Sequence, residues 1–428
     1  MTEGYVTPDA PTDIKCNAGI FIFTYPGFTV RLDHLHEGHD ELRAEVTVTG
    51  TMPDADGLLL QYRYNLSSPT AGNTLTKALS ELAPAVPWRQ VVTYVFHQVL
   101  RRWREGEPLR KFEDVQVNTD ALEHRVWPIV VEGKPNVWFG DSGSLKTYLA
   151  EYTQLMVALP ETSASGLRAE PGATLILDYE DEEGEWRQRN DALLRGLMYL
   201  SDAKPTIHYR RMTRPLTEDI ERLQSMVLEI GAEYVVIDSA GPAVGGELVD
   251  PKAVIPFFTA LRTLRYQQDW GDKGLRPCTT LTLAHEPKNA EKKTAFGSGF
   301  WKFEARSMWE VRRSKDADSP TVNIALYHHK TNKGMLRKPV ALQFAFTQDS
   351  PLTVAVKSFN IGDDSELAGN LPIKAQIKLL LRDGAMSEKD IAAELPGVRP
   401  TSLHPQLYEA VRDGVLVHLP DGKFGLAK

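Results

Sequence analysis

Four short apolar segments, separated by stretches with helical spacing, limit the fold of this chain more than any other feature. In chain order they read NVWFG, ATLILDYE, EYVVIDS and CTTLTLAH, and they fall between residues 136 and 285. Short apolar strands that alternate with helices are typical of parallel strands buried on both faces of a sheet. The pattern predicts an α/β fold with a mostly parallel sheet and right-handed crossovers. Three further strands, MWEVRRS, VNIALYHHK and VALQFAFT, are joined by short links, which predicts an antiparallel extension at one edge.

The chain has 428 residues, which at about 150 residues per domain is too long for one core. We expect a mobile tail over residues 1–15, where Pro, Thr and Asp occur without periodicity. Alternating strand patterns followed by two helical ones predict a small α+β domain over residues 16–108, whose role the sequence does not disclose. The α/β segments define a domain over residues 115–358. Residues 372–428 read as three short helices and a hairpin with Asp-Gly at its turn, the pattern of a winged helix-turn-helix.

Composition and charge exclude several classes of protein. With 42% hydrophobic and 25% charged residues, the chain has an average globular composition, which argues against general disorder. Its two cysteines, Cys16 and Cys278, provide no disulfide framework and no paired-cysteine metal site. No apolar run approaches the ~18 residues of a membrane span, and the N-terminus lacks a secretion signal, so we expect a cytoplasmic protein without membrane contact. Because the net charge is −8, any contact with nucleic acid must come from local basic loops.

Residues 140–147 have the spacing of a phosphate-binding loop between an apolar strand and a helix. In such a loop, backbone N–H groups and the helix N-terminus attract phosphate oxygens, and a lysine adds a point charge. We expect Thr147 to be a ligand of Mg²⁺. The expected nucleotide-binding residues are Gly140, Asp141, Ser142, Gly143, Ser144, Leu145, Lys146 and Thr147.

Only Leu145 departs from this pattern, which normally has glycine at that position. A leucine can still donate its backbone N–H to a phosphate, provided that its side chain points away into the packing between sheet and helix. The alternative interpretation is an ordinary strand-to-helix turn with a chance lysine.

Polar residues end three of the other apolar strands, at the edge where parallel sheets bind ligands. Asp238 ends EYVVIDS and could reach Mg²⁺ through water, although a simple capping role is the alternative. Among the acids Asp178, Glu180, Asp181 and Glu182, we expect Glu180 to orient the attacking water, with Asp181 as the next candidate. His285 ends TTLTLAH, where it could sense the γ-phosphate or equally be a packing residue.

The segment that follows, residues 286–303, combines cations with aromatic residues around two glycines. Lysines can follow a nucleic-acid backbone, and rings can stack on bases. This favours nucleic-acid binding by Lys288, Lys292 and Lys293, with stacking by Phe296, Phe300 and Trp301. The alternative is a surface loop whose aromatic side chains are buried in the fold.

Three later cations, Arg306, Lys330 and Arg337, are candidates for reaching the nucleotide of a neighbouring subunit, which requires an oligomer. Residues 372–428 contain eight Lys and Arg against seven Asp and Glu. A winged helix this close to neutral is typical of a protein-contact module, although DNA reading is also open.

The order of these motifs resembles that of the RecA-like P-loop ATPases, specifically the RepA-type hexameric replicative helicases and related AAA-family ATPases of phages and plasmids. The resemblance covers about residues 125–350 and rests on GDSGSLKT, LILDYEDEEGEW, VVIDSAGPA, LTLAHEPKN, GSGFWKFEARSMWEV and HHKTNKG. It implies that Glu180 activates water, Asp238 holds Mg²⁺ and His285 senses phosphate. It also implies DNA-binding loops inside a ring, at SAGPAVGGELVD and at 286–303, with Arg306 or Lys330 acting in trans. Some of these helicases have an arginine two places after that lysine, where this chain has Asn332.

Together these observations predict an ATP- and Mg²⁺-dependent motor that acts on DNA, with single-stranded DNA as the expected form, in a homo-oligomeric ring such as a hexamer. Replication or recombination proteins would be contacted through the C-terminal winged helix. Two alternatives stay open. One is a recombination mediator or annealing protein that ATP gates without unwinding, and the other is a DNA-binding regulator whose ATPase is a switch.

Overall fold

The computed structural model describes most of the chain, in segments separated by short gaps. The described residues are 10–17, 19–38, 41–52, 55–105, 109, 111–114, 124–159, 164–197, 205–266, 275–286, 299–314, 319–332, 334–347 and 350–427. The chain forms two compact units. The first comprises residues 1–121, 219–229 and 263–275, and the second comprises 122–218, 230–262 and 276–428.

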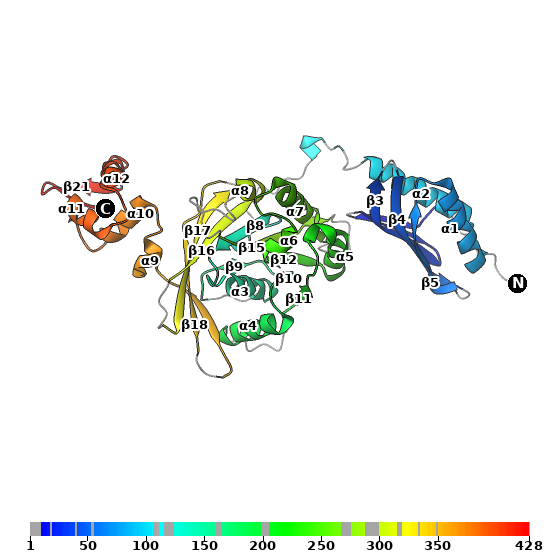
Figure 1. The fold of residues 1–428 in the computed structure, drawn as a ribbon, viewed down its shortest axis with the longest axis horizontal. Helices are drawn as coiled ribbons and strands as arrows, with labels where there is room; N and C mark the ends of the chain where they lie inside the picture. Colours follow the sequence, from blue (N-terminus) through cyan, green and yellow to red (C-terminus); the bar gives the residue numbers. More distant parts are fainter. Residues whose placement is uncertain are drawn as a thin grey trace. The chain divides into compact units, whose positions relative to one another are not determined.

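The first unit contains an antiparallel meander with two helices packed against it (Figure 1). Its elements are β1 (Asp13–Asn17), β2 (Ile20–Tyr25), β3 (Phe28–Gly38), β4 (Glu41–Met52), β5 (Ala55–Asn65), α1 (Pro69–Leu82) and α2 (Trp88–Glu105). Alternate residues of β4 are buried, as expected for a sheet with one face in a core. β1 begins at Asp13, inside the segment 1–15 that was expected to be a mobile tail. The pairing of β1 with β2 orders these residues, although β1 lacks an apolar run of its own.

The second unit is built on a nine-stranded sheet, which confirms the predicted α/β fold. The strands lie in the order β11 (Ile207–Arg211), β10 (Ala173–Asp178), β12 (Ala232–Asp238), β15 (Thr279–His285), β8 (Pro135–Gly140), β16 (Ser307–Arg313), β17 (Thr321–Thr331), β18 (Val340–Phe346) and β19 (Val354–Ser358). The first six are parallel, and β17 to β19 are antiparallel. The antiparallel extension was expected to begin with MWEVRRS, but this strand, β16, is parallel to β8. The extension begins at β17, which pairs with β16 in antiparallel orientation.

Helices follow most of the parallel strands. In the second unit they are α3 (Lys146–Ala158), α4 (Glu183–Gly196), α6 (Ala240–Val244), α7 (Pro251–Thr263) and α8 (Gly299–Glu304). The helix that follows β11, α5 (Ile220–Ile230), belongs almost entirely to the first unit. The antiparallel strands reach over α3, since Phe344 and Phe346 of β18 contact the rings of Tyr152 and Tyr148. The shorter elements are η1 (Phe112–Asp114), β6 (His124–Trp127), β7 (Val130–Val131), β9 (Arg168–Ala169), η2 (Leu216–Glu218), β13 (Arg265–Tyr266) and β14 (Arg276–Pro277).

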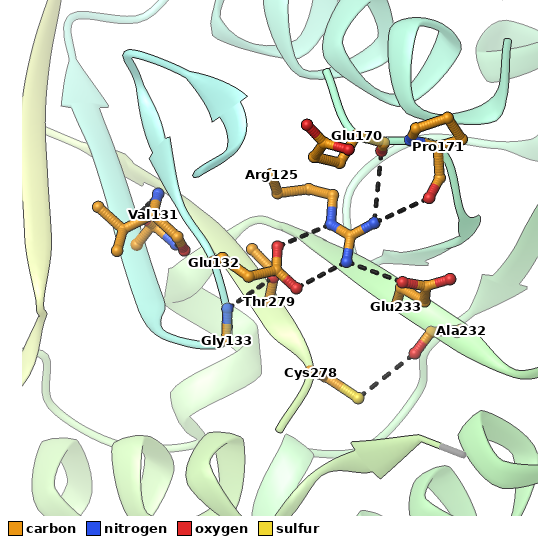
Figure 2. Close-up of polar contacts among 11 residues, drawn as sticks. Arg125, Val131, Glu132, Gly133, Glu170, Pro171, Ala232, Glu233, Cys278 and Thr279 are labelled. Carbon is orange, nitrogen blue, oxygen red and sulfur yellow. Dashed lines mark hydrogen bonds and ion pairs between the residues drawn. The ribbon is translucent and has the colours of Figure 1, made fainter. Parts of the chain in front are cut away.

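A buried arginine ties together the edge of the sheet at which β12, β15 and β8 begin (Figure 2). Arg125 of β6 donates from Nε and Nη2 to the carboxylate of Glu132, at 2.8 and 2.6 Å, and from Nη2 to Glu233 at 2.8 Å. Its Nη1 donates to the carbonyls of Glu170 and Pro171. All five N–H groups of the guanidinium are therefore used.

The described C-terminal part of the second unit contains four α-helices, a short 3-10 helix and a small sheet. Its elements are η4 (Ile361–Asp363), α9 (Ser365–Ala368), α10 (Ile373–Leu380), β20 (Met386–Ser387), α11 (Glu388–Glu394), α12 (Pro400–Arg412), β21 (Leu416–His418) and β22 (Lys423–Leu426). β21 and β22 form the expected hairpin, and β20 also pairs with β22. The winged-helix class stays a prediction. The break expected near residue 365 contains α9, whose Leu367 packs with Leu371 against Ala325 and Tyr327. Within the described part of the chain, no helix is long and apolar enough to cross a membrane.

Candidate functional site: a phosphate loop and three strand ends

The predicted phosphate loop connects β8, whose residues are all buried, to α3. The start of the loop runs close to the neighbouring strand β16. A Cβ built on Gly140 would lie 2.2 Å from the carbonyl oxygen of Val311, so only glycine fits there. The loop then turns at Gly143, where φ is +76°, a value that glycine adopts without strain.

Leu145 caps the N-terminus of α3 in the left-handed conformation, with φ +63° and ψ +23°. This conformation explains why glycine is usual at the position, since a Cβ makes it unfavourable by about 1–2 kcal/mol. The Leu145 side chain is half-buried and packs against the core of the second unit. The side chain therefore points into the packing between sheet and helix, as predicted.

Lys146 is the first residue of α3, and its ammonium group is held over the loop. Nζ donates to the carbonyls of Gly140 and Asp141, at 3.0 and 2.8 Å, and to Oγ of Ser144 at 3.2 Å. Burial lowers the pKa of Lys146 to about 8, although neighbouring carboxylates, Asp238 first, act in the opposite direction. The carboxylates compensate only part of the effect of burial on this cation, and a bound phosphate would add further negative charge beside it.

Thr147 and Asp238 are in direct contact, as expected for two ligands of one ion. The Thr147 hydroxyl donates to Oδ2 of Asp238 at 2.7 Å. Burial raises the pKa of Asp238 to about 6, with smaller contributions from Glu180 and Asp178, while the hydrogen bond from Thr147 opposes the shift. Two hard oxygen donors at this spacing suit Mg²⁺, which is usually held by one or two protein oxygens, substrate phosphates and water. Among the described residues, no group of three or more His, Cys, Asp or Glu side chains could hold a metal by itself.

Glu180 follows β10, in the short connection to α4. Its Oε1 accepts a hydrogen bond from the hydroxyl of Ser239 and lies 3.6 Å from Nε2 of His285. The interaction with His285 is the main cause of a lowered Glu180 pKa; burial opposes it, and Ser239 contributes in the same direction as His285. The carboxylate is therefore ionised at neutral pH and can accept a proton.

The four expected site strands end side by side. In the register of the sheet, Asp178 of β10 is opposite Asp238 of β12, and His285 of β15 is opposite Gly140 of β8. The structure therefore brings together the phosphate loop, Glu180, Asp238 and His285 at one edge, which we call the phosphate edge.

Four acids lie at the end of β10 and directly after it, and their surroundings differ. Asp178 is buried, and its Oδ1 accepts the backbone N–H groups of Glu180 and Asp181, each at 3.0 Å. Asp181, the second candidate for the base, is instead paired with Arg189 at 2.8 Å. Glu182 precedes α4 as its N-cap residue, without a side-chain capping bond.

Several residues at this edge were not predicted from the sequence. Ser239 contacts Glu180, and Tyr209 and Arg211 of β11 contact Asp178 at 2.8 and 3.3 Å. Arg313, the last residue of β16, donates to the carbonyl of Gly143 in the loop at 3.4 Å. A strand was not expected at β11, although the run IHYRR between two helices could have indicated one.

The three cations predicted to act in trans lie away from the phosphate edge. The N–H of Arg306 donates to the carbonyl of Pro135, at the start of β8, whereas the phosphate loop follows the end of that strand. Lys330 is nearby, and its Nζ donates to the carbonyls of Phe303 and Ala305. Arg337 donates its backbone N–H to His328 in β17.

The predicted nucleic-acid loop is only partly described. Lys288, Lys292, Lys293 and Phe296 lie outside the described residues. Trp301 was expected to offer a ring for stacking, and this prediction is wrong. The side chain is fully buried against Phe257 and Phe258 of α7, and its indole N–H donates to the carbonyl of Leu248.

One family model matches part of the chain, over residues that include this site. Residues 104–291, which include the phosphate loop, Glu180, Asp238 and His285, match the model of an AAA domain. Among solved structures, a KaiC-like protein from the archaeon Pyrococcus horikoshii is similar over 53% of this chain and 90% of its own, with 14% identity and a TM-score of 0.34. No curated protein matches the sequence. The AAA domain match and the strand–loop–helix geometry at residues 135–158 support a P-loop ATPase.

Proposed function

We propose that the protein hydrolyses ATP with Mg²⁺ at the phosphate edge and uses the reaction to move on or remodel DNA. The observation that carries the proposal is the convergence of Lys146, the Thr147–Asp238 pair and Glu180 at adjacent strand ends. Phosphoryl transfer needs positioning and charge stabilisation more than covalent chemistry, and these residues provide both.

Each residue has a distinct role in the proposed reaction. The loop amides and Lys146 would bind the β- and γ-phosphates, and Thr147 and Asp238 would hold Mg²⁺. When bound, the ion supplies charge neutralisation on the phosphate oxygens. Glu180 would orient a water and accept its proton as the oxygen attacks the γ-phosphorus and the bond to the bridging oxygen of ADP breaks. His285, next to Glu180, would respond to the γ-phosphate.

The positions of Arg306 and Lys330 support an oligomer. At about 3.3 Å per residue, the six residues of β8 separate Arg306 from the phosphate loop by roughly 20 Å, which is too far for action on the same subunit. In a head-to-tail assembly, the edge that carries these cations would face the phosphate edge of a neighbour. A closed ring of this kind, such as a hexamer, is the assembly that the motif order implies.

The DNA-acting role rests on the motif order and on the basic segment 286–303. We propose a replicative helicase or a related replication ATPase that binds single-stranded DNA and contacts other replication or recombination proteins through residues 372–428. The test is ATP hydrolysis by the full-length protein with and without single-stranded DNA. Lys146→Ala should abolish hydrolysis and its stimulation by DNA, and DNA-stimulated turnover in that variant would contradict the site assignment.

Strand displacement on a forked duplex, measured beside annealing of complementary strands, separates the helicase from the alternatives. Displacement that requires ATP supports a motor. Annealing without displacement would contradict the motor and support an ATP-gated annealing protein. The mass of the protein with an ATP analogue and single-stranded DNA tests the ring, because a monomer under these conditions would contradict it.

A further inference from the structure

The loop that carries Glu180 is fixed at its far end by a residue of the following helix. Asp181 Oδ2 accepts a hydrogen bond from Nη2 of Arg189 in α4, at 2.8 Å. At its near end, the loop is held by the two backbone N–H groups that donate to Asp178. Arg189 therefore provides a further attachment, from the following helix, for the loop that carries Glu180.

Arg189 also contacts the helix that begins at the phosphate loop. Its Nε donates at 2.6 Å to Oε1 of Glu151, a fully buried residue of α3 that follows Thr147 by one helical turn. The guanidinium lies 5.4 Å from the ring centroid of Trp186 and 6.0 Å from that of Tyr148. Two carboxylates and two aromatic rings thus fix the orientation of one side chain.

Stability alone does not account for this arrangement. Taking an ion pair out of water is so unfavourable that well-packed apolar residues are often as stabilising in its place. Here the second oxygen of Glu151 is buried and has no hydrogen-bond partner among the described residues. What the arrangement does provide is a rigid link from the Glu180 loop to the helix that begins with Lys146 and Thr147.

We infer that Arg189 is a positioning residue for ATP hydrolysis, which holds the Glu180 loop against α3 at a fixed distance from the phosphates. The inference rests on the proposed function of Glu180. A displacement of about 1 Å in a reacting group can lower a rate by roughly 100-fold. Nucleotide binding depends on the loop amides and Lys146, which Arg189 does not contact. Loss of Arg189 should therefore lower kcat and leave KM unchanged.

The chain offers a matched control in Arg125, a buried arginine that likewise lies between two carboxylates (Figure 2). We expect Arg189→Met to lower kcat for ATP about 10- to 100-fold, with KM within threefold of the wild-type value. Arg125→Met should leave kcat within twofold, measured at a temperature at which both variants are folded. An unchanged kcat in Arg189→Met, or an equal loss in Arg125→Met, would overturn the inference.

A milder pair of variants decides the question if either arginine variant fails to fold. Asp181→Asn weakens the link at a side chain that is 42% exposed, and Glu233→Gln makes the corresponding change beside Arg125. We expect Asp181→Asn to lower kcat at least threefold at constant KM, and Glu233→Gln to have no such effect. Equal kcat values in the two variants would overturn the inference.

Hydrogen exchange of the Glu180 and Asp181 backbone amides tests the link without any hydrolysis. We expect faster exchange in Asp181→Asn and Arg189→Met, and wild-type exchange in the Arg125 and Glu233 variants. If the wild-type protein does not hydrolyse ATP, the proposed function fails, but exchange still shows whether Arg189 holds the loop. Unchanged exchange in Asp181→Asn would contradict the positioning role even in an active enzyme.

Discussion

At each end of the parallel strands an arginine lies between two carboxylates, the buried Arg125 at one end and the half-buried Arg189 at the other, yet the groups around them differ. At the edge where the strands begin, Arg125 has an acceptor for every N–H group. At the phosphate edge, Glu151 keeps one oxygen without a partner among the described residues. Burial also raises the pKa of Asp238 to about 6 and lowers that of Lys146 to about 8.

This difference separates a structural network from a reactive one. A network that only joins segments is most stable when each donor has its acceptor inside the protein. Groups that bind a charged ligand remain electrostatically unsatisfied in the protein alone, and perturbed pKa values therefore gather where ligands bind. The comparison can be tested by changing one edge at a time.

The largest expected effect on stability comes from Arg125. Replacing it by methionine leaves Glu132 and Glu233 without their shared cation, and we expect the free energy of unfolding to fall by about 3–5 kcal/mol. Arg189→Met should lose less, about 1–2 kcal/mol, because burial already raises the pKa of Glu151 to about 8 and the carboxyl can take up a proton. Urea unfolding at pH 7 measures both values. A larger loss for Arg189→Met would reverse the comparison.

The next effect concerns pH. Burial is the main reason that the pKa of Glu151 is raised to about 8; Arg189 opposes the shift, while Asp238 and Asp181 add to it. Because this pKa is higher than that of an unfolded glutamate, about 4.3, the carboxyl favours folding at low pH and loses that contribution as pH rises to about 8. Glutamine does not titrate, so Glu151→Gln does not lose stability in this way as pH rises. Its stability relative to wild type should rise by about 4 kcal/mol between pH 5 and pH 8.5 in urea unfolding, and a pH-independent difference would contradict the assignment.

The smallest expected effect is at Leu145. Glycine would relieve the left-handed conformation, a gain of about 1 kcal/mol, but would lose the packing of a half-buried side chain against the core. The two effects nearly cancel, so Leu145→Gly should bind ATP within threefold of wild type in equilibrium titration. A tenfold loss of affinity would show that the leucine itself shapes the loop.

The sequence predicted the central strands of the sheet better than its outermost strands. β8, β10, β12 and β15 are continuous apolar runs, because both faces of each strand are buried, and all four are confirmed. β11 and β19 are the outermost strands of the sheet and were not expected. Edge strands are partly exposed, and their order depends on pairing with a neighbour, which a short sequence window does not contain.

The residues of the site also divide into those that the sequence predicted and those that it did not. The meeting of Glu180, Asp238 and His285 with the phosphate loop could be predicted because parallel strands share one carboxyl edge. The position of Arg189 could not be predicted, because in the helical sequence EGEWRQRNDALLRG it resembles any surface arginine. Only the packing of α4 beside α3 places its guanidinium between Asp181 and buried Glu151.

The most direct test of the central claim is single-turnover hydrolysis of ATP with Mg²⁺ by the full-length protein and by Glu180→Gln, with ATP affinity measured on both. Glutamine retains the size of the side chain and can accept from Ser239, but it cannot accept the proton of the attacking water. We predict that Glu180→Gln binds ATP within threefold of wild type and hydrolyses it at least 100-fold more slowly, as expected on losing a general base. Hydrolysis at the wild-type rate in this variant would contradict the account of the phosphate edge.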